Sequence, residues 1–186
     1  GAGAAPTFQA AGGGGLVHLD TQTPSGGASV AFTSTHITAT YDHYVVKISN
    51  MNHQSDSDFR ILVSNDNGSS YEGGTNYNYR SYEESETGAV YNRTAAGQGK
   101  IVVGGSHDGE PSNSHTYNIE ISGLMSAAKK TTFRWSAGYR QSASSEWFTG
   151  SGGGEYLVAE AVNNIQFIMA SGTITGTFSL FGVAKS

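Results

Sequence analysis

Residues 116–139, TYNIEISGLMSAAKKTTFRWSAGY, contain two segments in which apolar and polar side chains alternate. The apolar members are Tyr117, Ile119 and Ile121 in the first segment and Phe133, Trp135 and Ala137 in the second. Successive side chains of a β-strand point to opposite faces, so a period of two predicts two strands, each with one buried face. Residues 126–130 between them form the one plausible helical turn of the sequence, and we interpret this turn as a connector.

Similar segments recur along the chain, separated by clusters of Gly, Asn, Asp and Ser. The further predicted strands are residues 16–20, 28–33, 43–48, 58–64, 76–82, 100–104, 155–159, 163–170 and 175–183. Helical periodicity is nearly absent, and about ten to twelve short strands suit two packed antiparallel sheets of the jelly-roll type. The sequence therefore predicts an all-β fold, a jelly-roll-like antiparallel β-sandwich formed by residues 16–186 as a single domain.

Glycine accounts for 26 of the 186 residues, roughly twice its usual share. Residues 1–15, GAGAAPTFQAAGGGG, are predicted to be a flexible N-terminal arm in which Phe8 is the one large apolar side chain. The arm either has no role or becomes ordered against a neighbouring subunit, with Phe8 as its anchor. We interpret the glycines of residues 150–154 as linkers and turns. Asn67 and Gly68 favour positive φ values and predict a tight hairpin.

The charge balance and the cysteine count exclude several classes of function. The formal net charge is −5, and no basic run occurs, so nucleic acid is not an expected partner. The absence of cysteine rules out disulfides, thiolate metal ligands and a cysteine nucleophile. No apolar run is long enough to suggest membrane insertion.

Sequence motifs for catalysis are missing. The nucleophile motif G-x-S-x-G does not occur, and no two of the six histidines have the H-x-H or H-x-x-x-H spacing of a metal site. Glu83, Glu84 and Glu86 are too close together in sequence to oppose one another across a cleft, and we interpret them as solvating a loop. We therefore expect no enzymatic activity, no cofactor and no bound metal.

Aromatic residues are the more informative feature. Between positions 71 and 91 the chain has five of its ten tyrosines, among asparagine, serine and arginine residues. Such a composition is typical of recognition surfaces, but it also suits an aromatic core face or a contact between subunits. Tyr77, Tyr79 and Tyr82 are therefore candidates for contact with a glycan or a subunit. Trp147 is a fourth candidate, as a platform for a sugar ring, unless it caps the sandwich together with Phe148.

Four segments resemble a family of known proteins. They are TYDHYVVKISNM (residues 40–51), DFRILVSNDNGSSY (58–71), NYNYRSY (76–82) and VNNIQFIMASGTITGTFSLFGVAK (162–185). In this order they are similar to a β-rich domain of tailed-phage and prophage virion proteins of the tail-fibre or head-fibre-like type. The resemblance extends over nearly the whole chain, and its closing segment is the most specific part.

The resemblance implies a structural component of the virion surface, in contact with other virion proteins and displayed on the tail or the head. Homotrimers are the usual arrangement of such proteins, and loops facing outward would contact a host surface glycan. The resemblance implies no catalytic residue. The alternative is a free carbohydrate-binding β-sandwich that uses Trp147 and the tyrosine-rich segment as stacking platforms.

Overall fold

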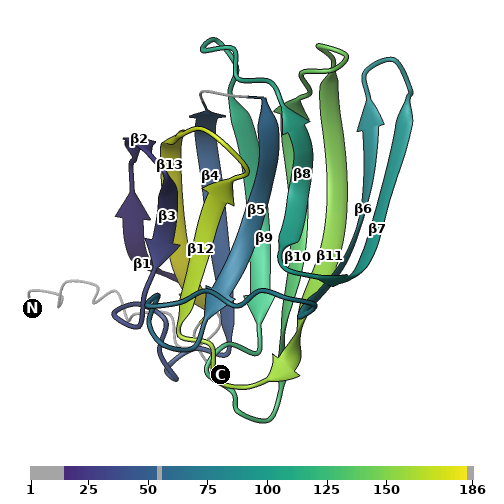
Figure 1. Cartoon of the computed structure of the whole chain (residues 1–186). Helices are drawn as coiled ribbons and strands as arrows, with labels where there is room; N and C mark the ends of the chain where they lie inside the picture. The colour runs from purple at the N-terminus through teal and green to yellow at the C-terminus, as the bar shows by residue number, and fades with distance from the viewer. Residues whose placement is uncertain (1–14, 54–55, 184–186) are drawn as a thin grey trace, which may run out of the picture.

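The computed structural model describes residues 15–53 and 56–183, and the regular elements among them are all β-strands. The strands are β1 (Leu16–Gln22), β2 (Ser25–Gly27), β3 (Ser29–Phe32), β4 (His43–His53), β5 (Ser57–Ser64), β6 (Tyr77–Ser85), β7 (Val90–Gln98), β8 (Ile101–His107), β9 (His115–Ser122), β10 (Lys130–Arg140), β11 (Trp147–Ala159), β12 (Asn164–Met169) and β13 (Ile174–Val183). They form two antiparallel sheets packed as a sandwich (Figure 1). This confirms the predicted all-β class.

The larger sheet has nine strands in the order β1, β13, β4, β9, β10, β11, β6 and β7, with β2 paired to β13. The smaller sheet has four strands in the order β3, β12, β5 and β8. The long strands run side by side, and most of the longer loops gather at the two ends of the sandwich (Figure 1). The larger sheet therefore has one face against the smaller sheet and one face free of it.

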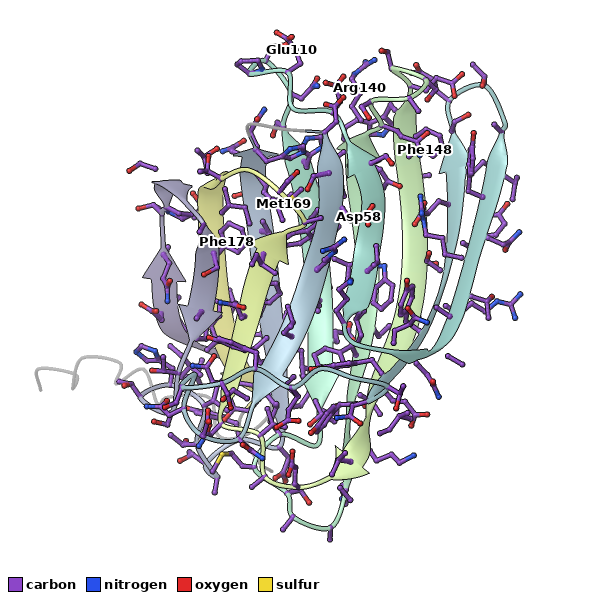
Figure 2. The ribbon with its side chains drawn as sticks, viewed as in Figure 1. Asp58, Glu110, Arg140, Phe148, Met169 and Phe178 are labelled. Atoms are coloured by element: carbon purple, nitrogen blue, oxygen red, sulfur yellow. The ribbon has the colours of Figure 1, made fainter. Side chains whose placement is uncertain are left out.

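Aromatic side chains from both sheets fill the layer between them. Phe59 of β5 packs against Tyr117 of β9, with ring centroids 5.0 Å apart, and Phe167 of β12 lies 6.0 Å from Phe178 of β13. All four side chains are buried. Figure 2 shows the side chains of this layer, with Phe178 labelled. Burial of such large apolar groups is the main favourable contribution to folding.

The two alternating segments quoted first form β9 and β10, which are neighbours in the larger sheet. Trp135 pairs with Ile119 on the buried face, whereas Arg134 pairs with Glu120 on the opposite face. The predicted alternation is therefore confirmed. Residues 123–129 connect the two strands through turns and contain no helix, so the expectation of a helical turn is wrong.

The glycines of residues 150–154 lie inside β11, and their interpretation as linkers and turns is wrong. Gly152 faces the core, where a Cβ atom would lie only 2.2 Å from Cζ2 of Trp135. A Cβ atom on Gly154 would lie 2.9 Å from the carbonyl oxygen of Asn78. The run of glycines thus belongs to a strand because large neighbouring groups occupy the space where side chains would be.

Asn67 and Gly68 have φ values of 61° and 87°, which confirms the predicted turn. The predicted hairpin is wrong, because β5 pairs with β12 and β8 while β6 pairs with β11 and β7. This turn therefore lies on a connection that leads from the smaller sheet to the larger one. The Asp66 carboxylate holds it by accepting hydrogen bonds from Ser70 N at 2.9 Å and Ser70 Oγ at 2.6 Å. These bonds lower the pKa of Asp66 to about 2.

Candidate functional site

The free side of the larger sheet is a broad polar surface. Side chains alternate along each strand, so the neighbours of the buried residues point away from the core. Strand register places one such row across six strands: Lys47 of β4, Asn118 of β9, Ser136 of β10, Ser151 of β11, Tyr82 of β6 and Asn92 of β7. We call the outward side chains of these six strands, with this row at their centre, the outer polar face.

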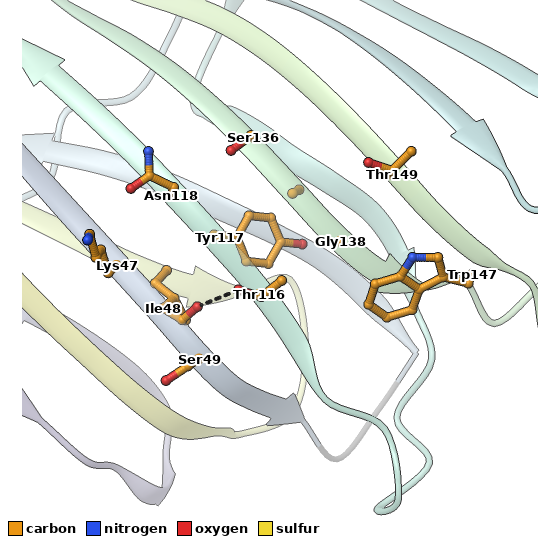
Figure 3. Close-up of a pocket in the computed structure, with 11 residues that line it drawn as sticks. Lys47, Ile48, Ser49, Thr116, Tyr117, Asn118, Ser136, Gly138, Trp147 and Thr149 are labelled. Atoms are coloured by element: carbon orange, nitrogen blue, oxygen red, sulfur yellow. Dashed lines mark hydrogen bonds between the residues drawn. The ribbon is translucent and has the colours of Figure 1, made fainter.

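A hollow of about 700 Å³ opens on the outer polar face, above β4, β9, β10 and the start of β11 (Figure 3). Most of its outward side chains are small and polar, namely Ser49, Thr116, Asn118, Ser136 and Thr149. Lys47 and Trp147 are its two large outward side chains. Hollows of this volume are typical of small-molecule sites.

The polar groups of the hollow are available to a ligand. Thr116 donates its hydroxyl to the carbonyl oxygen of Ile48 at 3.1 Å, the dashed line of Figure 3. In the described part of the chain, the side chains of Asn118, Ser136 and Thr149 form no hydrogen bond. Amide and hydroxyl groups both donate and accept, so these three side chains can pair with a partner that offers either.

Trp147 forms one end of the hollow and is held against the sheet. It is the first residue of β11, and its side chain is 38% exposed. Its indole covers Gly138 of β10, where a Cβ atom would lie 2.7 Å from Cζ2 of the ring. The adjacent Phe148 is buried and stacks on Tyr139 at 5.9 Å between ring centroids. The exposed indole is thus anchored by its neighbours in sequence and in space.

The three candidate tyrosines of β6 occupy different environments. Tyr77 is fully buried, and its hydroxyl accepts a hydrogen bond from Val63 N at 3.0 Å. This corrects the expectation of a surface contact for Tyr77, because its ring is part of the core. Tyr79 is half-buried and packs against the core, whereas Tyr82 is 47% exposed on the outer polar face. Tyr82 and Trp147 are therefore the candidates that a ligand can reach on this face.

Glu83 is buried in β6, so its interpretation as part of a solvated loop is wrong. Its carboxylate accepts hydrogen bonds from Tyr139 Oη at 2.8 Å and Ser81 Oγ at 3.0 Å, and it forms an ion pair with Arg93 at 3.2 Å. Burial and the Glu83 charge raise the pKa of Tyr139 above its usual value. This network links β6, β7 and β10 on the inner side of the sheet, away from the outer polar face.

Three histidines that are far apart in sequence meet in the core. His53, His107 and His115 are buried, with ring centroids 5.2 to 5.7 Å apart. They lie at the ends of β4 and β8 and at the start of β9, so sheet pairing brings them together rather than local spacing. Among the described residues, no group of three or more His, Cys, Asp or Glu side chains could hold a metal ion.

Hydrogen bonding and burial favour the neutral form of two of these rings. Asp108 O faces His115 Nε2 at 3.3 Å, and Arg140 N donates to His115 Nδ1 at 3.3 Å. His107 Nδ1 faces the carbonyl oxygen of Ser57 at 3.3 Å, and its Nε2 contacts the Tyr117 hydroxyl. Because a backbone N–H can only donate, His115 Nδ1 accepts and carries no proton, so this ring is neutral. Burial, with the neighbouring imidazoles, lowers the pKa of His115 to about 4 and that of His107 well below its usual value.

The predicted arm, residues 1–15 with its anchor Phe8, lies outside the described residues except for Gly15. In the part of the chain that the structure describes, no helix is long and apolar enough to cross a membrane. Comparison of the chain with protein-family models, with curated proteins and with solved structures finds no match.

Proposed function

We propose that this protein is a non-enzymatic binding protein that recognises saccharides through the outer polar face. The observation that carries the proposal is the anchored, exposed indole of Trp147 at the end of an open hollow lined with hydroxyl and amide groups. The face of a sugar ring that has C–H groups packs on an aromatic ring, while its hydroxyls need donors and acceptors around the rim. The hollow supplies both.

The position of Trp147 favours recognition over a packing role. Its ring does not cap the sandwich, because it lies on the side of the larger sheet that faces away from the smaller one. An aromatic side chain that is already held in place loses little conformational entropy when a ligand binds. The arrangement therefore suits a preformed platform.

We further propose that the protein acts as a surface component of a phage virion, where the bound saccharide belongs to the host surface. The four segments that resemble tail-fibre and head-fibre-like proteins support this context. The proposed virion protein would have a jelly-roll-like topology, would attach to other virion proteins through the arm of residues 1–15, and would assemble as a homotrimer. Detection of the protein on purified particles and a trimeric mass in light scattering test this context separately from saccharide binding.

The test of saccharide binding compares three forms of the full chain on a glycan panel. Wild type is expected to bind at least one glycan, and Trp147→Ala is expected to weaken that binding at least tenfold. Val17→Ala is the control, because Val17 is 40% exposed but lies in β1 at the edge of the larger sheet, four strands away from β10 and five from β11. Unchanged binding by Trp147→Ala, or no binding by wild type, would overturn the proposal.

A further inference from the structure

The outer polar face has two arginines that flank a glycine. Strand register pairs Arg134 of β10 with Gly153 of β11, and Gly153 with Arg80 of β6. Neighbouring strands are about 4.8 Å apart, so the two arginine Cα atoms are roughly 10 Å apart across the glycine. Both side chains are exposed on the same face. Their guanidinium groups can therefore approach one small group that lies above Gly153.

Neither arginine has an ionic partner within the described residues. The ion pairs there join Asp20 to His36, Asp58 to Arg60, Glu83 to Arg93 and Glu155 to Lys130. The acid opposite Arg134 in register is Glu120 of β9, on the side away from Gly153, and no ion pair joins the two. The positive charges of Arg80 and Arg134 are thus available to an anion.

The glycine between them differs from the other glycines of β11. Cβ atoms on Gly150, Gly152 and Gly154 would each come within 3 Å of another part of the chain, so packing explains their lack of a side chain. A Cβ atom on Gly153 would meet only the carbonyl oxygen of Phe133, at 3.3 Å. A side chain at position 153 would therefore meet much less of the chain than one at the other three positions.

Further hollows continue from the one at Trp147 to this position. The first shares Asn118 and Ser136 with a hollow of about 210 Å³ that is also lined by Arg134, Ser151 and, on the side away from Gly153, Glu120. Ser151 also lines a third hollow, of about 400 Å³, together with Arg80, Gly153 and the exposed Tyr82. From Thr149 to Gly153 the strand spans about 13 Å. The three hollows together are therefore longer than a single sugar ring.

From these observations, and resting on the proposed function, we propose that the ligand is an acidic oligosaccharide. One sugar packs on Trp147, and a carboxylate or sulfate group further along the chain lies over Gly153 between Arg80 and Arg134. Guanidinium groups bind such planar or multi-oxygen anions through paired, charge-assisted hydrogen bonds. Because the whole protein has a net charge of −5, this selectivity arises from the local pair rather than from a general attraction of anions.

The test measures binding of matched acidic and neutral glycans: polygalacturonate with its fully methyl-esterified form, and chondroitin sulfate with its desulfated, carboxyl-reduced form. Wild type is expected to bind at least one acidic glycan at least tenfold more tightly than its neutral partner. Arg80→Gln with Arg134→Gln is expected to remove this preference. Lys129→Gln, a change of charge in the exposed β9–β10 connection, is the control and is expected to change the affinity less than twofold.

A second variant tests the position of the anion. Gly153→Val places a side chain that suits a strand between the arginines, so it is expected to abolish the acidic preference in a protein that still folds. Equal binding of acidic and neutral glycans by wild type, or an unchanged preference in the double arginine variant, would overturn the inference. If neutral glycans still bind in a Trp147-dependent manner, the proposed function stands while the inference fails; if no glycan binds, both fail.

Discussion

The indole of Trp147 occupies the space that a side chain at position 138 would fill. Gly138 lies inside β10, two residues before the strand ends, and glycine within a strand weakens a sheet. Glycine is nevertheless required at position 138, because the Trp147 ring lies directly over it on the surface of the sheet. This relationship ties a local packing requirement to the proposed binding platform.

Gly138→Ala is the first prediction. The added Cβ atom would lie 2.7 Å from Cζ2 of Trp147, so the ring must move away from the sheet. We expect saccharide affinity to fall about three- to tenfold, about 1 kcal/mol, while the fold persists. Tryptophan fluorescence and glycan titration measure the two effects. Gly73→Ala, at a position with no atom near the added Cβ, should leave both unchanged; equal affinity in the two variants contradicts the prediction.

Two adjacent glycines of β11 give the second prediction. Gly152→Ala places a Cβ atom 2.2 Å from the buried Trp135 ring, and overpacking of this kind lowers the free energy of unfolding by about 3 kcal/mol. Gly153→Ala adds its methyl group to the outer face, where the nearest atom is the Phe133 carbonyl oxygen at 3.3 Å, and should change that free energy by less than about 1 kcal/mol. Denaturant unfolding measures both. Similar destabilisation of the two variants would show that the faces of β11 are assigned incorrectly.

The third prediction concerns the buried network around Glu83. Glu83→Gln leaves the Arg93 charge without its partner, and the expected loss in free energy of unfolding is about 2 to 4 kcal/mol. Glu84→Gln changes the next residue, which is exposed on the other face, and should cost less than about 0.5 kcal/mol. Thermal and denaturant unfolding provide the measurement. A cost for Glu84→Gln as large as that for Glu83→Gln would argue against the buried ion pair.

The fourth prediction is a loss of stability in mild acid. His107 and His115 are held neutral in the folded protein, with the pKa of His115 lowered to about 4, whereas in the unfolded chain both protonate near pH 6.5. The unfolded state therefore binds more protons as the pH falls from about 6.5 to 4, and stability present above pH 6.5 is lost in that window. The slope approaches about 1.4 kcal/mol per pH unit for each histidine.

Unfolding free energies measured between pH 7.5 and 4 test this dependence. His115→Gln should reduce the slope by the contribution of one histidine, and His18→Gln, at an exposed position of edge strand β1, is the control. The lowered pKa of Asp66 acts in a separate window, below about pH 4, and also reduces stability as the pH falls. A pH-independent free energy between pH 6.5 and 4.5 would contradict the buried, neutral state of the two rings.

The alternation of apolar and polar residues predicts strands best where one face of the strand is buried and the other is exposed to solvent. β9 and β10 satisfy this condition, and their alternation is visible in the sequence. β7 does not, because this edge strand is exposed or half-buried along its whole length. It therefore lacks the row of buried apolar side chains from which a strand is recognised in the sequence. The glycines of β11 were interpreted incorrectly for a different reason. The groups that leave no room for side chains at Gly152 and Gly154 are Trp135 and Asn78, which belong to neighbouring strands.

The candidate site was predictable only in part. Trp147 stands out in the sequence as a tryptophan beside small polar residues, and the exposed Tyr82 belongs to the tyrosine-rich segment between positions 71 and 91. The row that leads from the hollow beside Trp147 to Tyr82 depends on the order and register of strands that are far apart in sequence. So does the placement of Arg80 and Arg134 on either side of Gly153. The same is true of the three histidines. Such contacts follow from sheet topology, which alternation alone does not specify.

Backbone amide chemical shifts recorded during a titration with an acidic oligosaccharide locate the ligand on the protein. We expect the perturbed residues to cluster on the outer polar face, at Asn118, Ser136, Thr149, Ser151 and Gly153. We also expect the indole N–H of Trp147 to shift more than that of the buried Trp135. Perturbations confined to the smaller sheet or to the loops at the ends of the sandwich would contradict this expectation.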